Sequence, residues 1–238
     1  MSLARRIVAE ALGAALLLAA VVGSGIMGER LAEGNVAIAL LANTLATGAT
    51  LVAMILAFGP VSGAHFNPVV TLADASQGGL AWRDVPDYLF AQFLGAFAGV
   101  AAADLMFGEP LFAASLHVRA GAAQLLSEFI ATFGLLAVIW GCARWRSSAV
   151  PFAVGAYITG AYWFTASTSF ANPAVTLARS VTNTFAGIRP VDAPAFIAAQ
   201  FAGATAATVL FRWLIPSLPK NATSVVVPHP SRQVVHER

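Results

Sequence analysis

Six long apolar stretches constrain this chain more than any other feature of its sequence. They run roughly over 7–27, 35–58, 87–107, 122–143, 149–168 and 193–215. A helix needs about 20 apolar residues to cross a bilayer. Only 10% of the residues are charged, whereas soluble domains carry about 25%. The chain is therefore expected to be an all-α integral membrane protein with six transmembrane helices.

The first stretch needs separate treatment because it follows Arg5 and Arg6, as the apolar part of a signal peptide would. However, it contains Glu10 and continues to Met27 without a clear cleavage site. We therefore interpret it as a retained first transmembrane helix.

The remaining composition excludes several classes of function. Cys142 is the only cysteine, so the chain has no disulfide framework, and no His/Cys cluster has metal-ligand spacing. No phosphate-binding loop or nucleophile motif is present, and a net charge of +2 is too small to indicate nucleic acid. We expect no enzyme activity and no catalytic residue, no metal or other cofactor, and no nucleic-acid partner.

Two segments between the long stretches carry nearly the same short motif. The segment 59–86 contains "NPVVTLADAS", and the segment 169–192 contains "NPAVTLARSV". Each apolar piece is about ten residues long, too short to span a bilayer. Both are predicted to be re-entrant half-helices, which membrane proteins tolerate where they line a cavity.

The Asn-Pro pair at the start of each motif predicts where these half-helices begin. The side-chain oxygen of Asn accepts a hydrogen bond from a first-turn N–H, and Pro suits the first helical position. Asn67 and Asn172 would then each cap a helix and leave the amide NH₂ free to point into a lumen. Two positive helix ends that face each other at mid-membrane donate hydrogen bonds to the solute and repel cations. They also interrupt proton transfer along the hydrogen-bonded water molecules in the lumen.

The two motifs belong to an internal repeat that covers about 5–107 and 122–215. Three pairs of positions match: Glu10 with Glu128, Asn67 with Asn172, and Gln92 with Gln200. Each half contains three spans, so the second half has to enter from the opposite face, which predicts an inverted repeat.

The distribution of Lys and Arg predicts the orientation. With the N-terminus inside, nine basic residues fall on the cytoplasmic side and four on the outer side. Both termini are therefore expected in the cytoplasm. We expect a channel domain over 1–217 and a flexible cytoplasmic tail over 218–238, which is polar and contains proline.

These features together resemble the major intrinsic protein (aquaporin and aquaglyceroporin) family. The resemblance rests on "SGAHFNPVVTLA", "FANPAVTLARS" and the paired Glu and Gln residues, and it covers about 5–215. It implies a right-handed bundle of six helices plus two half-helices, with one pore per subunit in a homotetramer surrounded by lipid. The mid-membrane residues would be Asn67, Pro68, Val69, Asn172, Pro173 and Ala174. The sequence looks most like bacterial members associated with arsenic handling, which implies the inner membrane of a bacterium.

The chain departs from the family pattern at two positions. Val69 follows the first Asn-Pro where the family has Ala, and Val175 follows the second Asn-Pro-Ala where most members have the Arg of the selectivity filter. Counting back from the motifs gives the remaining filter positions as Thr47, Gly160 and Ser169. All four filter residues are small or medium in size. The expected filter is wide, with neither an aromatic ring nor a fixed cation.

Arg179 is the main objection to a filter without a cation. It lies one helical turn beyond Val175 on the same face. Three roles remain open: a vestibule residue, a replacement for the missing filter arginine, or a structural salt bridge, for example with Asp192.

Glu10, Glu128 and His65 are the other polar residues expected near the motifs. Charges inside a span are costly and usually functional. Each glutamate either braces the backbone of a re-entrant loop, which the resemblance favours, or forms part of a proton relay. His65 either lines the cytoplasmic mouth or holds its loop by hydrogen bonds.

We therefore expect a passive channel for small uncharged solutes: water, glycerol-like polyols and metalloid hydroxides such as arsenite, with methylated arsenicals as a further option. Two alternatives remain. One is a water-selective pore in which Arg179 completes the filter, and the other is a proton-coupled transporter that uses Glu10 or Glu128.

Overall fold

The computed structural model describes residues 1–215, with the backbone alone at 144 and 145. Its elements are α1 (Leu3–Leu31), α2 (Val36–Ser62), α3 (Pro68–Ser76), η1 (Trp82–Asp84), α4 (Val85–Phe107), α5 (Ala122–Trp145), η2 (Ser147–Ala149), α6 (Val150–Phe164), α7 (Pro173–Arg179) and α8 (Ala193–Leu214). Within residues 1–215 there is no β-strand, which confirms the all-α expectation. The tail expected over 218–238 lies outside the described residues.

Five of the described helices are long and apolar enough to cross a membrane: α1, α2, α4, α5 and α8. The sixth expected span, 149–168, is shorter than predicted, because α6 has 15 residues and ends at Phe164. At 1.5 Å per residue such a helix is about 22 Å long, less than the roughly 30 Å of a hydrocarbon core. From Thr165, whose backbone is extended, the chain leaves the helix and leads to α7 by an irregular path.

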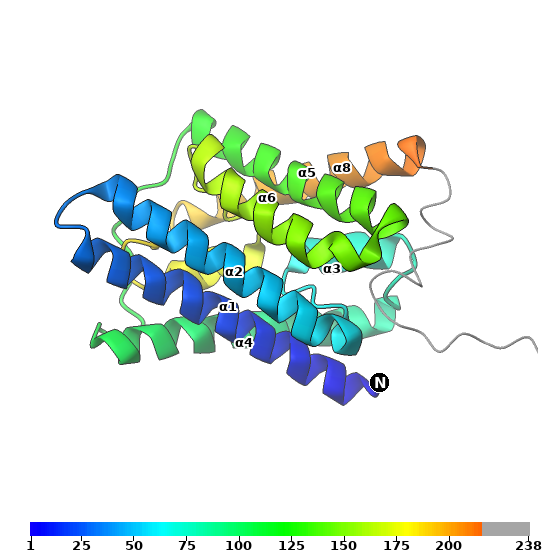
Figure 1. Cartoon of the computed structure of the whole chain (residues 1–238), viewed down its shortest axis with the longest axis horizontal. Coiled ribbons are helices and arrows are strands. Elements are labelled where there is room, and N and C mark those ends of the chain that lie inside the picture. The colour runs from blue at the N-terminus through cyan, green and yellow to red at the C-terminus, as the bar shows by residue number, and fades with distance from the viewer. Residues whose placement is uncertain (216–238) are drawn as a thin grey trace, which may run out of the picture.

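The helices form two groups with the same internal arrangement. In the first, α1 packs against α2 and α4; in the second, α5 packs against α6 and α8; and α2 meets α6 across the centre. Figure 1 shows the first group below the second, with the end of α8 lying at the same end of the molecule as the N-terminus. A side chain at Gly95 of α4 would collide with the backbone of α1, and one at Gly203 of α8 with that of α5. Small residues permit these close approaches.

The short helices α3 and α7 lie between the two groups and contact each other (Figure 1). Their bounds match the predicted half-helices. Each has Asn as its N-cap and Pro directly after it. Neither is long enough to span a bilayer, so the chain enters and leaves the interior on the same side at each.

Large apolar side chains remain exposed on the outer faces of the bundle. Phe90 and Leu94 of α4 and Trp213 of α8 are each more than half exposed. Contact with lipid requires apolar side chains on the outside and a backbone whose hydrogen bonds are made internally. A helical bundle with exposed apolar side chains meets both requirements.

Candidate functional site: a pore between two capped half-helices

The loops that lead into α3 and α7 share an unusual backbone conformation. In the first loop, Ala64 and Phe66 have φ of 51° and 49°. In the second loop, Ser169 and Ala171 have φ of 53° and 49°. These residues stand three and one positions before the capping Asn in each half. Non-glycine residues are rarely found in this region, and such a conformation persists only where its surroundings enforce it.

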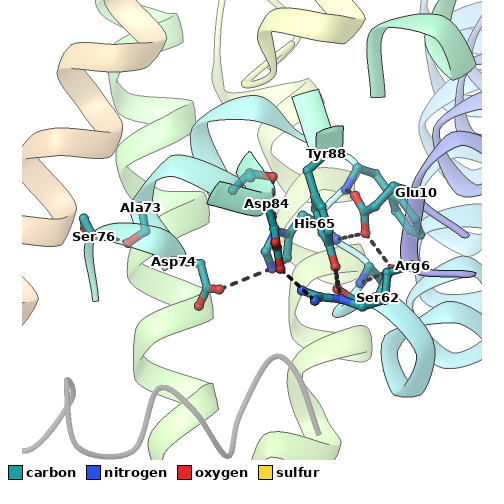
Figure 2. A network of polar contacts seen from close by, with 12 residues as sticks. Arg6, Glu10, Ser62, His65, Ala73, Asp74, Ser76, Asp84 and Tyr88 are labelled. Atoms are coloured by element: carbon teal, nitrogen blue, oxygen red, sulfur yellow. Dashed lines mark hydrogen bonds and ion pairs between the residues drawn. The ribbon is translucent and has the colours of Figure 1, made fainter. Parts of the chain in front are cut away.

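Glu10 of α1 holds the first loop in place. Its Oε1 accepts hydrogen bonds from the N–H of His65 at 3.0 Å and from the hydroxyl of Ser62 at 2.6 Å. Its Oε2 accepts from the N–H of Phe66 at 2.7 Å and from the amide of Gln92 at 2.8 Å. The buried carboxylate therefore satisfies two loop N–H groups that have no helical partner. Figure 2 shows Glu10 beside His65 and Ser62.

Glu128 of α5 does the same for the second loop. Its two oxygens accept from the N–H groups of Phe170 and Ala171, each at 2.9 Å, and from the amide of Gln200 at 2.6 Å. Gln200 also donates to Thr176, just as Gln92 donates to Thr71 in the first half. These contacts are those of a brace, and they use both carboxylates as acceptors for the backbone.

The two asparagines connect the half-helices to each other. The side-chain oxygen of Asn67 accepts from the N–H of Val69 at 3.1 Å, and that of Asn172 from the N–H of Ala174 at 2.9 Å. The amide of Asn67 donates to the carbonyl of Ala171, and the amide of Asn172 donates to the carbonyl of Phe66, both at 2.8 Å. The expectation of a wholly free NH₂ was therefore wrong. Each NH₂ keeps only one hydrogen for the lumen, because the other crosses to the opposite loop.

A cavity of about 440 Å³ passes these asparagines. Its lining includes Pro60 of α2 and Ser148 of η2, the two asparagines, and Thr47 and Arg179. The other mid-membrane residues are buried but do not line it: Pro68, Val69, Pro173 and Ala174. Val69 packs instead among apolar side chains such as Leu136 and Trp140. The extra bulk at Val69 thus lies outside the cavity.

The structure places three of the four expected filter residues on the cavity: Thr47, Ser169 and Val175. The expectation that Gly160 lines the filter was wrong. Gly160 is exposed on the outside of α6, with open space where a Cβ would stand. From α6, Tyr162 lines the cavity instead, and its hydroxyl lies 3.3 Å from that of Thr47. Two residues correspond to about 200° around a helix, so Gly160 and Tyr162 point to nearly opposite sides. The expectation that no ring reaches the filter level was therefore wrong.

Arg179 also lies on the cavity, although it is only 2% exposed. Its Nε donates to the carbonyl of Ala186, and its guanidinium carbon lies 3.4 Å from the centre of the Phe170 ring. Among residues 1–215, no carboxylate lies within salt-bridge distance of it. The suggested pair with Asp192 does not form, because Asp192 binds Arg189 at 2.9 Å. The expectation that no fixed cation remains near the filter was wrong as well.

A second buried arginine, Arg119, comes from the loop between α4 and α5. It donates to the carbonyls of Gly187 and Ser167 at 2.8 and 3.3 Å, and its guanidinium carbon lies 5.0 Å from the centre of the same Phe170 ring. His117 of this loop is close by: burial lowers its pKa, and the charges of Arg119 and Arg179 lower it further. The basic groups of Arg119, Arg179 and His117 therefore lie together here, whereas two carboxylates of the same end, Glu109 and Asp192, pair with Arg30 and Arg189.

The opposite end holds charges of both signs (Figure 2). Arg6 pairs with Asp84 at 3.2 Å and donates to the hydroxyl of Tyr88 at 2.8 Å. His65 lines the cavity; its Nδ1 lies 3.1 Å from the hydroxyl of Thr71, and its Nε2 lies 3.6 Å from a carboxylate oxygen of Asp74. The His65 side chain is fully buried between these partners, so the ring holds the loop by hydrogen bonds, and only the backbone of His65 reaches the cavity.

Sequence reasoning missed Tyr162 and Arg119. A signal for Tyr162 existed: Pro151, Val154, Ile158 and Tyr162 follow helical spacing and all line the cavity, whereas Gly160 falls off that stripe. For Arg119 there was no comparable signal, because a lone arginine in a loop has no periodicity. Among the residues that the structure describes, no group of three or more His, Cys, Asp or Glu is arranged to hold a metal ion.

Comparison with known proteins agrees with this geometry. The family model "Major intrinsic protein" matches residues 1–160 and 141–237. The aquaglyceroporin AqpS of Rhizobium meliloti is 58% identical over 218 residues, which is 91% of this chain and 93% of that protein. Aquaporin NIP1-1 of Zea mays is 37% identical over 141 residues, 58% of this chain and 49% of that protein.

A solved structure extends the likeness to three dimensions. The X-ray structure of the aquaglyceroporin from Plasmodium falciparum superposes with a TM-score of 0.68 at 20% identity, over 91% of this chain and 99% of that one. At this identity the likeness concerns the fold, and it agrees with a bundle of spanning helices that encloses two re-entrant half-helices.

Proposed function

The chain belongs to the major intrinsic protein family, an integral membrane family of channels rather than enzymes, and we propose that it passes small uncharged solutes passively through the cavity described above. The observation that carries this proposal is the cavity itself. It passes both capping asparagines, and Val175 stands on its wall where most family members have the filter arginine. Such a channel equilibrates its solute and cannot concentrate it.

As the solute crosses, its hydrogen bonds to water are replaced by hydrogen bonds to fixed groups of the cavity wall. At mid-membrane, each Asn amide offers its remaining N–H to a hydroxyl or a water oxygen. The α3 and α7 N-termini, each with about half a positive charge, face this point and repel cations. A water that accepts from both amides points its own hydrogens along the path, which breaks proton transfer through the file.

The outer constriction selects by size and by hydrogen bonding. Val175 presents methyl groups, Ser169 is small, and Thr47 with Tyr162 offers hydroxyls on one side. This combination suits a solute with an apolar flank and several hydroxyl groups. Glycerol-like polyols and metalloid hydroxides such as arsenite have this chemistry, and methylated arsenicals add a methyl group that an apolar wall accommodates. Glycerol is the reference solute, because the 58% identical relative is named an aquaglyceroporin.

Stopped-flow light scattering of proteoliposomes tests this proposal. Vesicles that contain the full chain are mixed with an isosmotic inward gradient of glycerol, and in a second series with arsenite. Reswelling faster than in protein-free vesicles is expected for both. Rates equal to those of protein-free vesicles for every neutral solute would refute it.

A water-selective pore is the second candidate, and one observation favours it. Arg179 lines the same cavity as Val175, Thr47 and Tyr162, so a ring and a cation both belong to its wall. If Arg179 narrows the path, Arg179→Ala should raise the glycerol flux sharply. An unchanged glycerol flux in that variant would remove this candidate.

The membrane setting of the proposal is the inner membrane of a bacterium, with both termini in the cytoplasm and four copies in one assembly. The N-terminus and the end of α8 lie at one end of the molecule, and the exposed apolar faces of the bundle leave surface for neighbouring subunits. Chemical cross-linking in native membranes tests the assembly. Cross-linked species of up to four subunits are expected, and the presence of monomer alone would contradict a tetramer.

A further inference from the structure

Two buried arginines converge on one aromatic ring at the end of the molecule that carries the loop between α4 and α5. The guanidinium carbons of Arg119 and Arg179 lie 5.0 and 3.4 Å from the centre of the Phe170 ring. They are therefore at most 8.4 Å apart, the sum of the two distances. Arg119 is 8% exposed and Arg179 is 2% exposed. The two charges thus lie close together and largely out of water.

A separate small cavity of about 160 Å³ opens beside them. Its polar lining comes from Asn43, His117, Arg119, Thr168 and Arg179. Arg179 is the only one of its lining residues that also lines the large cavity. A water molecule takes up about 30 Å³ in the liquid, so the small cavity has room for a small ion together with water.

The carboxylates of Glu128 and Asp192 lie near this site, but within residues 1–215 neither forms a salt bridge with Arg119 or Arg179. No carboxylate lies within 4.0 Å of either guanidinium. The nearby carboxylate of Asp192 accepts from the side chain of Arg189 and from the backbone N–H of Arg119. Burying a charge without a partner is costly, and two like charges together are costlier still. The partners that the arginines do have are carbonyls and a hydroxyl.

Each guanidinium also has N–H groups that donate no hydrogen bond within residues 1–215. The two terminal nitrogens of Arg179 make no hydrogen bond within residues 1–215, and neither does one terminal nitrogen of Arg119. None of these nitrogens is among the fully buried atoms without a partner, and both arginines line the small cavity. Planar forks of N–H groups match the oxygens of carboxylate and phosphate groups.

We propose that the small cavity between Arg119 and Arg179 is a binding site for a small oxyanion of the phosphate and arsenate class. The ion neutralises the two guanidiniums and accepts from their free N–H groups, while His117 and Thr168 complete the polar wall. The shared Arg179 places the site next to the large cavity. The existence of the site does not depend on which neutral solute the channel passes.

A binding measurement on the full-length protein tests the site without any transport assay. The protein in nonionic detergent is titrated calorimetrically with sodium phosphate in a chloride buffer of constant ionic strength. A saturable site is expected. Arg119→Gln and Arg179→Gln are each expected to weaken the binding at least tenfold, because a hydrogen bond to a charged group contributes that much or more. The matched control Arg30→Gln removes an arginine that pairs with Glu109 outside this cavity, and it should bind within twofold of the wild type.

The thermal stability of the wild type gives a readout that needs no variant. A ligand that binds only the folded state raises the melting temperature, so phosphate should raise it above the value in equimolar chloride. The absence of both saturable heat and a melting shift would overturn the proposal, as would an Arg30→Gln variant that loses binding as completely as Arg119→Gln. Binding of a short-chain phosphatidylglycerol in place of free phosphate would overturn the assignment to a soluble ion.

Discussion

The two half-helix regions of this molecule are built alike at their centre and differently at their ends. Glu10 and Glu128 hold the N–H groups of equivalent loop residues, and Asn67 and Asn172 each cap a helix and bond to the opposite loop. Beyond this frame the regions diverge. The first region pairs its basic groups with carboxylates, as Arg6 does with Asp84. The second leaves Arg119 and Arg179 unpaired among residues 1–215. The features that both regions share form the passage, and the two arginines without a carboxylate partner within the described residues belong to the second region.

The largest effect should come from removing a brace. Glu10→Ala and Glu128→Ala each leave two loop N–H groups unsatisfied in the interior, and each such group costs about 1–3 kcal/mol. We expect both variants to lose several kcal/mol of stability and most of their yield of monodisperse protein. Thermal unfolding in detergent measures this loss. If one variant is normal and the other collapses, the equivalence of the two braces is wrong.

The capping asparagines should give a smaller effect. Asn67→Ala and Asn172→Ala each remove a cap, worth about 0.5–2 kcal/mol, and a cross-loop hydrogen bond, worth about 1 kcal/mol. We expect similar melting shifts in the two variants and a reduced glycerol flux in both. Thr208→Ser, on α8 away from the motifs, serves as a control with a near-normal melting temperature. If one variant keeps the wild-type glycerol flux, the asparagine that it replaces does not take part in glycerol permeation.

Arg179→Ala sharpens the comparison at the outer end. The constriction proposed here is already set by Val175 and Ser169, so loss of the guanidinium should change the glycerol flux less than tenfold, which is about 1.4 kcal/mol of barrier. Water and glycerol permeabilities of the same vesicles provide the measurement. A rise in glycerol flux well above tenfold with little change in water would instead favour the water-selective pore.

The smallest effect concerns the ion pair at the start of α8. The hydrogen bond from Arg189, and then that from the N–H of Arg119, hold the pKa of Asp192 below its usual range. A lowered folded-state pKa adds stability above the unfolded value of about 3.9, and this stability is lost as the pH falls through the folded pKa. The melting temperature of the wild type should therefore drop more steeply than that of Asp192→Asn when the pH falls below about 4. If the melting temperatures of the two proteins fall in parallel as the pH is lowered, Asp192 does not contribute to the loss of stability in acid.

The fold was predictable from sequence because its signals are long and repeated. Apolar stretches of about 20 residues identify spanning helices, and Asn followed by Pro marks the start of both half-helices, which begin at the expected residues. The end of α6 was harder to predict. It stops at Phe164, where Thr165 takes up an extended backbone. The chain then turns through positive φ at Thr168, Ser169 and Ala171, and no apolar pattern encodes that turn.

The site was predictable only where the motifs themselves supply the residues. The cavity positions of Asn67, Asn172 and Val175 follow from the half-helices. Counting back along the chain failed at Gly160, because an offset of two residues turns a helical side chain to nearly the opposite side. The position of Arg119 depends on the path of a whole loop over the end of the bundle, which local sequence does not determine.

The most direct test of the central claim compares wild type and Val175→Arg for water and glycerol in the same proteoliposomes. The account predicts that the wild type passes both solutes faster than protein-free vesicles. Val175→Arg places a guanidinium on the cavity wall, so it should retain water flux and lose at least about tenfold of its glycerol flux, a barrier of about 1.4 kcal/mol. A wild-type glycerol flux equal to that of protein-free vesicles, or a Val175→Arg variant with undiminished glycerol flux, would contradict the account.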